Sequence, residues 1–252
     1  MIGWRSLFLL ADRTDSHSGV TPLLNWAARY FPILRALKNS VGGRDTILEV
    51  GSGSFGLANY LPGRVVGCDV KFSVQPLPNM LPVRASAGLL PFADRSFSAV
   101  VSSDVLEHVP PDDRPQVIRE TLRVARQVAI FGFPCGPLAQ KLDASFLDFY
   151  RVRSLRPPEW LEEHMAYPFP ELDLFESLGS EWAVDCFGNE SLRFHNWMNH
   201  RERTGPWNRI FQAGLRAAPT VIESCLQRFD RAPYYRQICV LERRNDSFAS
   251  GG

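Results

Sequence analysis

The sequence predicts an α/β fold, in which a doubly wound and mostly parallel sheet carries helices on both faces. Three observations support this prediction. Short apolar runs alternate with helical stretches from residue 46 to residue 133, a glycine-rich turn follows the first run, and a helical, proline-punctuated stretch separates the last two apolar runs from the others. Strands that alternate with helices favour a parallel sheet, because each helix returns the chain to the same edge. Such sheets bind ligands beyond the carboxyl ends of their strands.

Residues 1–44 are expected to form an N-terminal helical segment. Thr21 and Pro22 have the character of an N-cap and a first helical position, and apolar residues then recur at helical spacing up to residue 38. Pro32 is expected to kink or divide this helix, because proline lacks the N–H that the helix needs there.

The main domain is expected to span residues 45–244. Its predicted strands lie at residues 46–51, 65–70, 82–85, 97–103, 128–133, 181–188 and 236–242, and helices are expected at 54–61 and after Pro110 and Pro111. A helical cap at about 134–180 and 190–230 is expected to cover the ligand crevice. The last two strands are predicted to pair antiparallel at the C-terminal edge of the sheet, and residues 245–252 to form a flexible tail.

The composition excludes the disordered and fibrous classes of protein. The chain has 252 residues, of which 45% are hydrophobic and 22% charged, and its 28 basic and 27 acidic side chains give a net charge of +1. A nearly neutral chain has no overall field to attract nucleic acid, so we expect no nucleic-acid partner. No apolar run approaches 18 residues, so no membrane span is expected. Nothing in the composition indicates an oligomeric state.

The cysteine and histidine residues indicate neither a disulfide framework nor a metal site. The five cysteines are widely spaced and include no C-x-x-C pair. A reducing, cytoplasmic location is therefore predicted. His195 and His200 are five residues apart, so on a helix their side chains point about 140° from each other, which disfavours a shared metal ion.

The sharpest motif is ILEVGSGSFG at residues 47–56, where a strand leads through Gly51, Gly53 and Gly56 into a predicted helix. Glycines let the backbone turn sharply and approach a ligand closely, and a helix N-terminus favours a negative group. The spacing G-x-G-x-x-G is also a dinucleotide fingerprint, and it is a weak signal alone. Asp69 ends the second strand, where its carboxylate can accept hydrogen bonds from ribose hydroxyls. Both NAD and S-adenosylmethionine suit this arrangement.

A third stretch, LLPFADRSFSAVVSSDVLEHVP at residues 89–110, distinguishes between the two candidate cofactors. With ILEVGSGSFG and with VVGCDV at 65–70, it resembles the class I S-adenosylmethionine-dependent methyltransferases, in particular their type 11 subgroup. The resemblance covers roughly residues 45–133 and implies a Rossmann-like sheet. Three motifs in the family's order are more specific than one glycine loop.

The resemblance also implies which residues bind the cofactor. The backbone at Gly51, Ser52 and Gly53 would line the methionine portion, Glu49 would lie near its ammonium group, and Asp69 would hold the ribose. The full set of implied cofactor residues is Glu49, Gly51, Ser52, Gly53, Asp69, Val70, Ser86, Ala87 and Ser103. This chain departs from the family at Ser86, where an aspartate usually meets the adenine amino group, at Ser98, and at residues 125–127, which replace a K-P-G-G turn.

Methyl transfer from a sulfonium needs little side-chain chemistry, because the reaction is an in-line displacement of a good leaving group. Positioning can supply roughly 7 to 11 kcal/mol of the barrier reduction. A general base is needed only for an acceptor that must lose a proton, and Asp104 and His108 are the candidates. For both residues the alternative is a structural role, in which the side chain stabilises the turn after the strand at 97–103. In the cap, Tyr150, Trp160, His164 and Tyr167 either contact the acceptor or belong to the core.

The sequence therefore predicts a methyltransferase that uses S-adenosylmethionine, needs no metal, and acts on a small-molecule or glycan-like acceptor. Two alternatives remain open at this point. The glycine motif with Asp69 is compatible with an NAD-dependent oxidoreductase, and the departures at Ser86 and Ser98 are compatible with a non-catalytic binding protein that retains the fold.

Overall fold

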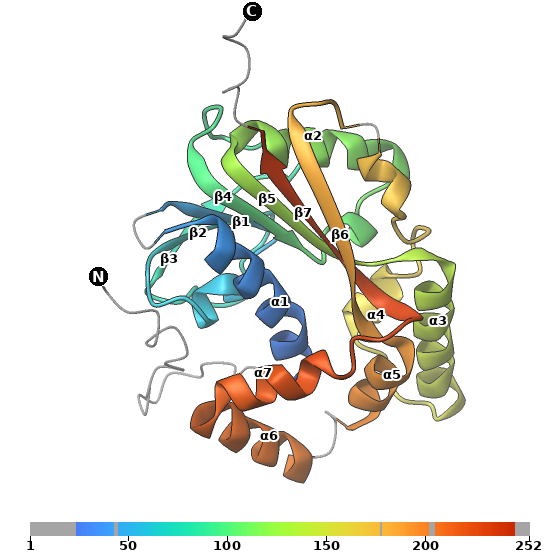
Figure 1. Cartoon of the computed structure of the whole chain (residues 1–252). Coiled ribbons are helices and arrows are strands. Elements are labelled where there is room, and N and C mark those ends of the chain that lie inside the picture. The colour runs from blue at the N-terminus through green and yellow to red at the C-terminus, as the bar shows by residue number, and fades with distance from the viewer. Residues whose placement is uncertain (1–23, 43–44, 177, 202–204, 245–252) are drawn as a thin grey trace, which may run out of the picture.

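A seven-stranded sheet forms the centre of the molecule, in the order β3-β2-β1-β4-β5-β7-β6 (Figure 1). The computed structural model describes residues 24–42, 45–176, 178–201 and 205–244. The strands are β1 (Ile47–Val50), β2 (Val65–Asp69), β3 (Met80–Arg84), β4 (Phe97–Ser103), β5 (Ala125–Pro134), β6 (Trp182–Ser191) and β7 (Tyr234–Arg243). Strands β1 to β5 are parallel, and β7 is antiparallel to both β5 and β6. The predicted mostly parallel sheet with an antiparallel pair at its C-terminal edge is confirmed.

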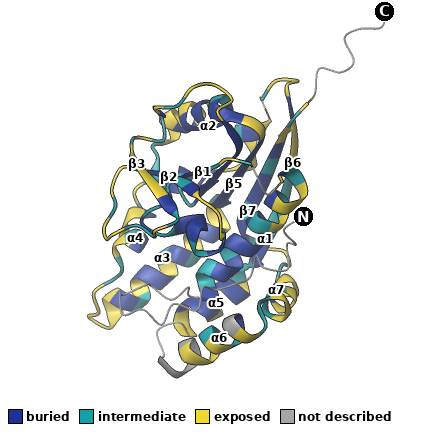
Figure 2. Ribbon diagram, turned by 90° about the vertical axis from the view of Figure 1, so that its left-hand side faces the viewer, coloured by how far each residue is buried: buried dark blue, intermediate teal, exposed yellow. Residues whose placement is uncertain are grey.

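Helices cover both faces of this sheet. The α-helices are α1 (Leu24–Ser40), α2 (Arg114–Val124), α3 (Gly136–Val152), α4 (Glu159–Glu163), α5 (Leu192–Arg201), α6 (Gly205–Ala217) and α7 (Pro219–Gln227). The 3₁₀ turns are η2 (Gly56–Asn59), η3 (Leu106–His108), η4 (Pro111–Asp113) and η5 (Leu172–Phe175). One apolar cluster joins α1, α5, α6 and α7 to one face, and a second joins α2 and η5 to the other. Figure 2 shows the buried sheet between these layers.

The central strands β1 and β4 are buried along nearly their whole length because both of their faces are covered. Every residue of β4 is buried, as expected for the middle of a parallel sheet. The register pairs Val50 of β1 with Ser102 of β4, and Ser103 with Gly132 of β5. The carboxyl ends of these strands therefore meet along one edge of the sheet, which we call the carboxyl edge.

Two predicted helical features differ in the structure. The predicted helix at 54–61 is only the short 3₁₀ turn η2, in which the Leu57 N–H is held by a side chain described below. Pro32 lies inside the continuous helix α1 and does not divide it. The Pro32 ring is buried, and packing of the apolar face of α1 offsets the one backbone hydrogen bond that proline removes. Thr21, Pro22 and the predicted tail lie outside the described residues.

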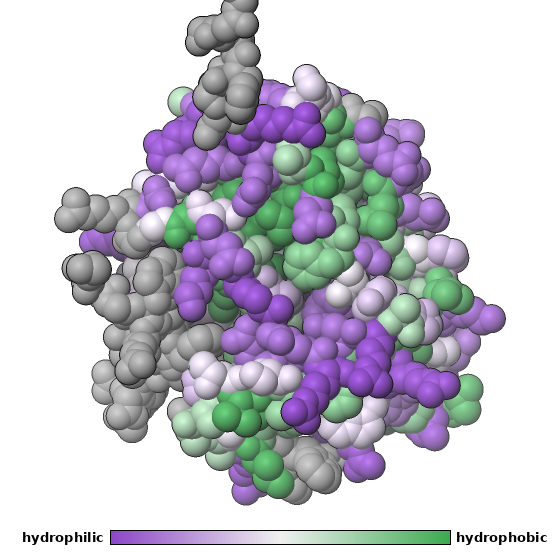
Figure 3. Space-filling model, in the orientation of Figure 1, coloured by the Kyte–Doolittle hydropathy of each residue, from purple (hydrophilic) through white to green (hydrophobic). Residues whose placement is uncertain are grey.

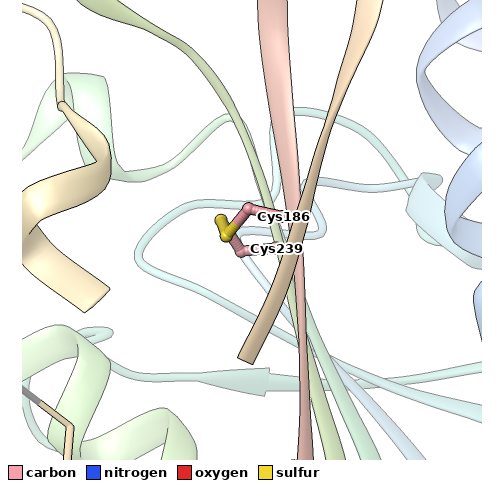
Figure 4. The surroundings of a disulfide bond; sticks show 2 residues. All are labelled: Cys186 and Cys239. Carbon is pink, nitrogen blue, oxygen red and sulfur yellow. A yellow bond between two sulfur atoms is a disulfide. The ribbon is translucent and has the colours of Figure 1, made fainter. Parts of the chain in front are cut away.

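The predicted absence of disulfides is wrong. Cys186 of β6 lies directly opposite Cys239 of β7, and the two form a disulfide (Figure 4). The two cysteines are 53 residues apart in the chain, so their spacing carries no sign of the pairing. Only the antiparallel register brings them together. Cys68, Cys135 and Cys225 remain thiols.

The surface is mixed in polarity. In the space-filling view, hydrophilic residues occupy most of the rim, and hydrophobic residues gather over the sheet in the upper centre (Figure 3). Among the helices that the structure describes, none has the length and apolar character needed to cross a lipid bilayer.

Gly188 of β6 offers a test of the β6–β7 packing. A Cβ atom added there would overlap the ring of Tyr234 on β7. We expect Gly188→Ala to lower the free energy of unfolding by about 1 to 3 kcal/mol, the usual cost of overpacking. Urea denaturation measures this change. Gly63→Ala is the control, because an added Cβ there meets nothing within 4 Å, and equal stability losses in the two variants would contradict the packing.

Candidate active site

The loop after β1 makes a sharp bend at the carboxyl edge. Gly51, Gly53 and Gly56 have φ angles of +77°, +53° and +40°, a region that side chains other than glycine rarely adopt. A Cβ on Gly51 would also collide with Val105, whereas a Cβ on Gly53 would meet nothing within 4 Å. The bend, which we call the glycine bend, is therefore packed against the protein at Gly51 and open at Gly53.

Asp69, at the end of β2, lies against the glycine bend. Its Oδ2 accepts a hydrogen bond from the Gly53 N–H at 2.7 Å, and its Oδ1 accepts one from the Lys71 N–H at 3.0 Å. The carboxylate is only partly buried, and each oxygen keeps a lone pair for another donor. The structure thus brings together the two features that the sequence analysis assigned to one cofactor.

Glu49 is bound to the protein itself. Its side chain is 1% exposed, Oε2 accepts a hydrogen bond from the Leu57 N–H at 2.6 Å, and Oε1 accepts one from the Tyr30 hydroxyl at 2.8 Å. Burial raises the pKa of Glu49 to about 7. A Cβ on Gly56 would overlap this carboxylate. Glu49 therefore supports the glycine bend from inside and ties it to α1, and its predicted contact with a ligand ammonium stays a prediction.

The remaining predicted cofactor residues line the same edge in different ways. Ser52 is buried, and its hydroxyl donates to the Gly53 carbonyl at 3.0 Å. Ser103 is buried at the end of β4, and its hydroxyl has no hydrogen-bond partner among the described residues. Val70 is 61% exposed. Ser86, exposed in the turn after β3, accepts a hydrogen bond from the Gly88 N–H, and Ala87 is half-buried beside it.

Asp104 is held by two arginines. It follows β4 with a φ of +53°, its Oδ2 lies 2.7 Å from Arg29 of α1, and its Oδ1 contacts Arg236 of β7. Arg236 is 2% exposed, and burial lowers its pKa well below the usual range. Each guanidinium contacts one oxygen of the carboxylate, so the side chain of Asp104 is fixed between α1 and β7. The geometry favours an anchoring role over that of a base.

His108 is the better placed of the two candidate bases. It ends η3, and its Nδ1 lies 3.2 Å from the Glu163 carboxylate in the cap. Burial, with smaller electrostatic contributions from His164 and Arg29, lowers the pKa of His108 to about 4. The imidazole is therefore neutral at pH 7 and retains a nitrogen lone pair that can accept a proton.

The predicted cap residues divide into core and polar groups. Tyr150 is buried in an apolar cluster of the cap, and Trp160 packs its ring 5.1 Å from that of His164. His164 is buried, and its Nδ1 lies 2.7 Å from Asp143 of α3. Tyr167 is half-buried, and its carbonyl accepts a hydrogen bond from Gln140. Of the four, His164 is the one that faces the polar groups after β4.

Sequence reasoning missed four charged residues at this edge: Arg29, Glu107, Asp143 and Arg236. Glu107 stands within the L-E-H triplet that supported the resemblance, yet it was not assigned a role. It is fully buried, and burial raises its pKa to about 8. Asp143 accepts hydrogen bonds from His164 and from the Tyr235 hydroxyl. Arg29, Asp143 and Arg236 come from α1, α3 and β7, and no local sequence pattern links those elements to β4.

The fold and the glycine bend define an α/β domain whose carboxyl edge suits an adenosyl or nucleotide group. Residues 48–133, from β1 to β5, match a family model described as a methyltransferase domain. A curated relative named an uncharacterized methyltransferase, from Mycobacterium marinum, is 40% identical over 107 residues, which is 37% of this chain and 39% of the relative. The chain thus spans well under half of that relative's length.

Solved structures of methyltransferases are among those similar to this chain. A magnesium protoporphyrin IX methyltransferase from Synechocystis has a TM-score of 0.47 and 14% identity over 88% of this chain and 83% of that one. A Haemonchus contortus phosphoethanolamine N-methyltransferase has a TM-score of 0.45 and 17% identity over 84% of this chain and 52% of that one. Both scores are below 0.5, so the assignment rests on the sequence matches.

Residues 48–133 are therefore similar to a methyltransferase domain. This confirms the resemblance to methyltransferases drawn from the three motifs. The match also supports S-adenosylmethionine as the cofactor of this domain.

Glu49 is expected to make stability depend on pH. Its folded pKa of about 7 lies above the ordinary value of 4.5, so its contribution to stability is fully present below pH 4.5 and is lost as the pH rises through 7. Because Gln cannot ionise, Glu49→Gln should gain stability relative to the wild type by up to about 3 kcal/mol between pH 4.5 and pH 8. Urea denaturation at several pH values measures this gain. A stability difference that stays constant with pH, as expected for the exposed control Glu176→Gln, would contradict it.

Asp104→Asn distinguishes an anchor from a base. Loss of the carboxylate leaves the buried Arg236 without its partner, so we expect the free energy of unfolding to fall by roughly 3 to 5 kcal/mol. Chemical denaturation measures this loss, with the exposed Asp112→Asn as control. An Asp104→Asn protein with wild-type stability and no activity would instead identify Asp104 as the base.

Proposed function

We propose that this protein transfers a methyl group from S-adenosylmethionine to a small-molecule or glycan-like acceptor. The observation that carries the proposal is the contact between the Gly53 N–H and Asp69 at the carboxyl edge, within the segment that matches a methyltransferase domain. A glycine-lined bend beside a partly exposed carboxylate suits an adenosyl group with two ribose hydroxyls.

In this proposal each part of the cofactor meets a different part of the edge. The backbone at Gly51–Gly53 takes the methionine portion, and the open space at Gly53 allows its close approach. Asp69 accepts hydrogen bonds from the ribose through its free lone pairs. Ser86 and Ala87 meet the adenine edge, with the exposed Val70 against the ring. Ser103, at the end of β4, lies on the side from which the acceptor approaches.

The reaction needs placement of the acceptor more than side-chain chemistry. Bringing the acceptor atom in line with the methyl carbon and the sulfur accounts for most of the rate enhancement that the protein must supply. For an acceptor that carries a proton, His108 is the group that can remove it, because its neutral ring holds a free lone pair. Asp104 serves by keeping Arg29 and Arg236 paired next to this site.

The acceptor and the compartment are inferred from the composition. The net charge of +1 supplies no field for a polyanionic acceptor, which favours a small molecule or a glycan-like compound. A cytoplasmic location stays a prediction, and the Cys186–Cys239 disulfide is an observation that weighs against it.

Binding measurements separate the proposal from its two alternatives. Isothermal titration with S-adenosylmethionine, S-adenosylhomocysteine and NAD should show saturable binding of the first two alone. NAD binding without a response to S-adenosylmethionine would support the oxidoreductase. Incubation with labelled S-adenosylmethionine and a cell extract should yield a labelled product, and cofactor binding with no labelled product from any extract would support a binding protein.

Asp69→Ala is expected to weaken S-adenosylmethionine binding by about 1.5 to 3 kcal/mol, the scale of hydrogen bonds to a charged group. The variant removes both the proposed ribose acceptor and the support of the Gly53 N–H. Titration calorimetry measures the change in affinity, and Asp112→Ala, which changes an exposed carboxylate in η4, is the matched control. Equal affinities in the wild type and Asp69→Ala would remove Asp69 from the site.

A further inference from the structure

Three possible metal ligands meet beside the carboxyl edge. Glu107 and His108 come from η3, directly after β4, and His164 follows the last residue of α4 in the cap. One donor atom of each lies within 4.8 Å of the others, and the distance from Glu107 Oε1 to His164 Nε2 is 3.9 Å. Two ligands of a tetrahedral metal at about 2.1 Å are about 3.4 Å apart. The Glu107–His164 pair needs to close by only about half an ångström.

Glu107 is the strongest sign that a ligand belongs here. Its side chain is 0% exposed, and within the described part of the chain neither carboxylate oxygen has a hydrogen-bond partner. Leaving a buried carboxylate unsatisfied is costly. A cation between Glu107 and the two imidazoles removes that cost.

His164 is oriented toward this position. Its Nδ1 lies 2.7 Å from Asp143 Oδ2, which also accepts a hydrogen bond from the Tyr235 hydroxyl at 2.8 Å. A neutral imidazole that donates from Nδ1 to a carboxylate presents the lone pair of Nε2, here toward Glu107. Two acceptors that face each other in a buried site need a proton or a metal cation between them.

His108 shows the same arrangement on the more open side. Its Nδ1 lies 3.2 Å from Glu163 Oε2. Histidines that bind metals in proteins usually donate their other N–H to a carboxylate, which sets the ring orientation and raises the basicity of the binding nitrogen. Both histidines of this cluster have such a carboxylate.

Arg114 holds the two halves of the cluster together. It is buried at the start of α2, and its Nε donates to the carbonyls of Leu106 and Val109 on either side of the ligands in η3. Its Nη2 donates to the carbonyl of Pro168 in the cap at 2.5 Å. The turn and the cap are thus fixed relative to each other, so the three ligands are positioned before an ion binds.

We propose that Glu107, His108 and His164 bind one divalent transition-metal ion. One carboxylate and two imidazoles suit Zn²⁺, Co²⁺, Mn²⁺ or Fe²⁺ better than Mg²⁺ or Ca²⁺, which prefer oxygen ligands alone. Three protein ligands leave an open coordination position, which would take an oxygen atom of the acceptor. The ion would occupy the His108 lone pair, so in the metal-bound protein His108 would hold the ion and would not remove a proton. The contact between the ion and the acceptor rests on the proposed methyl transfer, whereas metal binding by the three residues does not. The proposal departs from the sequence prediction of no metal, because His164 joins the cluster only through the cap.

The test uses tag-free, full-length protein stripped with EDTA and titrated with Co²⁺, whose visible absorption reports its coordination. We expect one Co²⁺ per chain, displaced by Zn²⁺ and not by Mg²⁺, and mass spectrometry of the metal content checks the stoichiometry. Glu107→Gln and His108→Gln should each weaken Co²⁺ binding at least 100-fold. His200→Gln, which changes an exposed histidine on α5, should leave it unchanged.

Binding of S-adenosylhomocysteine, measured by calorimetry in every variant, shows that the protein remains folded and reports on the proposed function separately. Wild-type protein that binds S-adenosylhomocysteine and takes up none of the transition metals would overturn the metal site and leave the methyltransferase proposal standing. Unchanged Co²⁺ binding in folded Glu107→Gln and His108→Gln would overturn it as well. Loss of Co²⁺ binding in both, with wild-type affinity for S-adenosylhomocysteine, supports it.

Discussion

Two carboxylates hold the glycine bend, and the arrangement of the carboxyl edge depends on them. Backbone N–H groups that leave a strand lose their partners and need other acceptors. Here Asp69 accepts from the Gly53 N–H, while Glu49 accepts from the Leu57 N–H and the Tyr30 hydroxyl. The bend is thus supported from β1, from β2 and from α1, and its open side at Gly53 is available to a ligand without rearrangement.

Buried charges at this edge occur in pairs, and the pairs connect elements that are distant in the chain. Asp104 joins α1 to β7 through Arg29 and Arg236, and Asp143 joins α3 to the end of α4 through His164. A buried charge is tolerated only when it is paired, so each pair also fixes the spacing of the elements that carry it. Glu107 is the exception, because its buried carboxylate has no hydrogen-bond partner among the described residues, and this indicates a cation.

The last strand contributes to the site as well as to the sheet. Because β7 is inserted antiparallel between β5 and β6, its first residues lie at the carboxyl ends of the parallel strands. Tyr235 and Arg236 reach Asp143 and Asp104 from there. Further along the strand, Cys239 bonds to Cys186 of β6. The C-terminal part of the chain therefore completes the edge that the motifs of the N-terminal half begin.

The sequence by itself determined the α/β class, the five parallel strands, the glycine bend and the place of Asp69, because strand patterns and turn glycines are local signals. It did not predict the reduction of the 54–61 helix to a 3₁₀ turn, the Cys186–Cys239 disulfide, the ion pairs of Asp104 or the meeting of Glu107 with His164. These depend on strand register and on how the cap packs, and both are decided by contacts between residues far apart in the chain. Such contacts leave no periodic trace in the sequence, so only the tertiary structure could supply them.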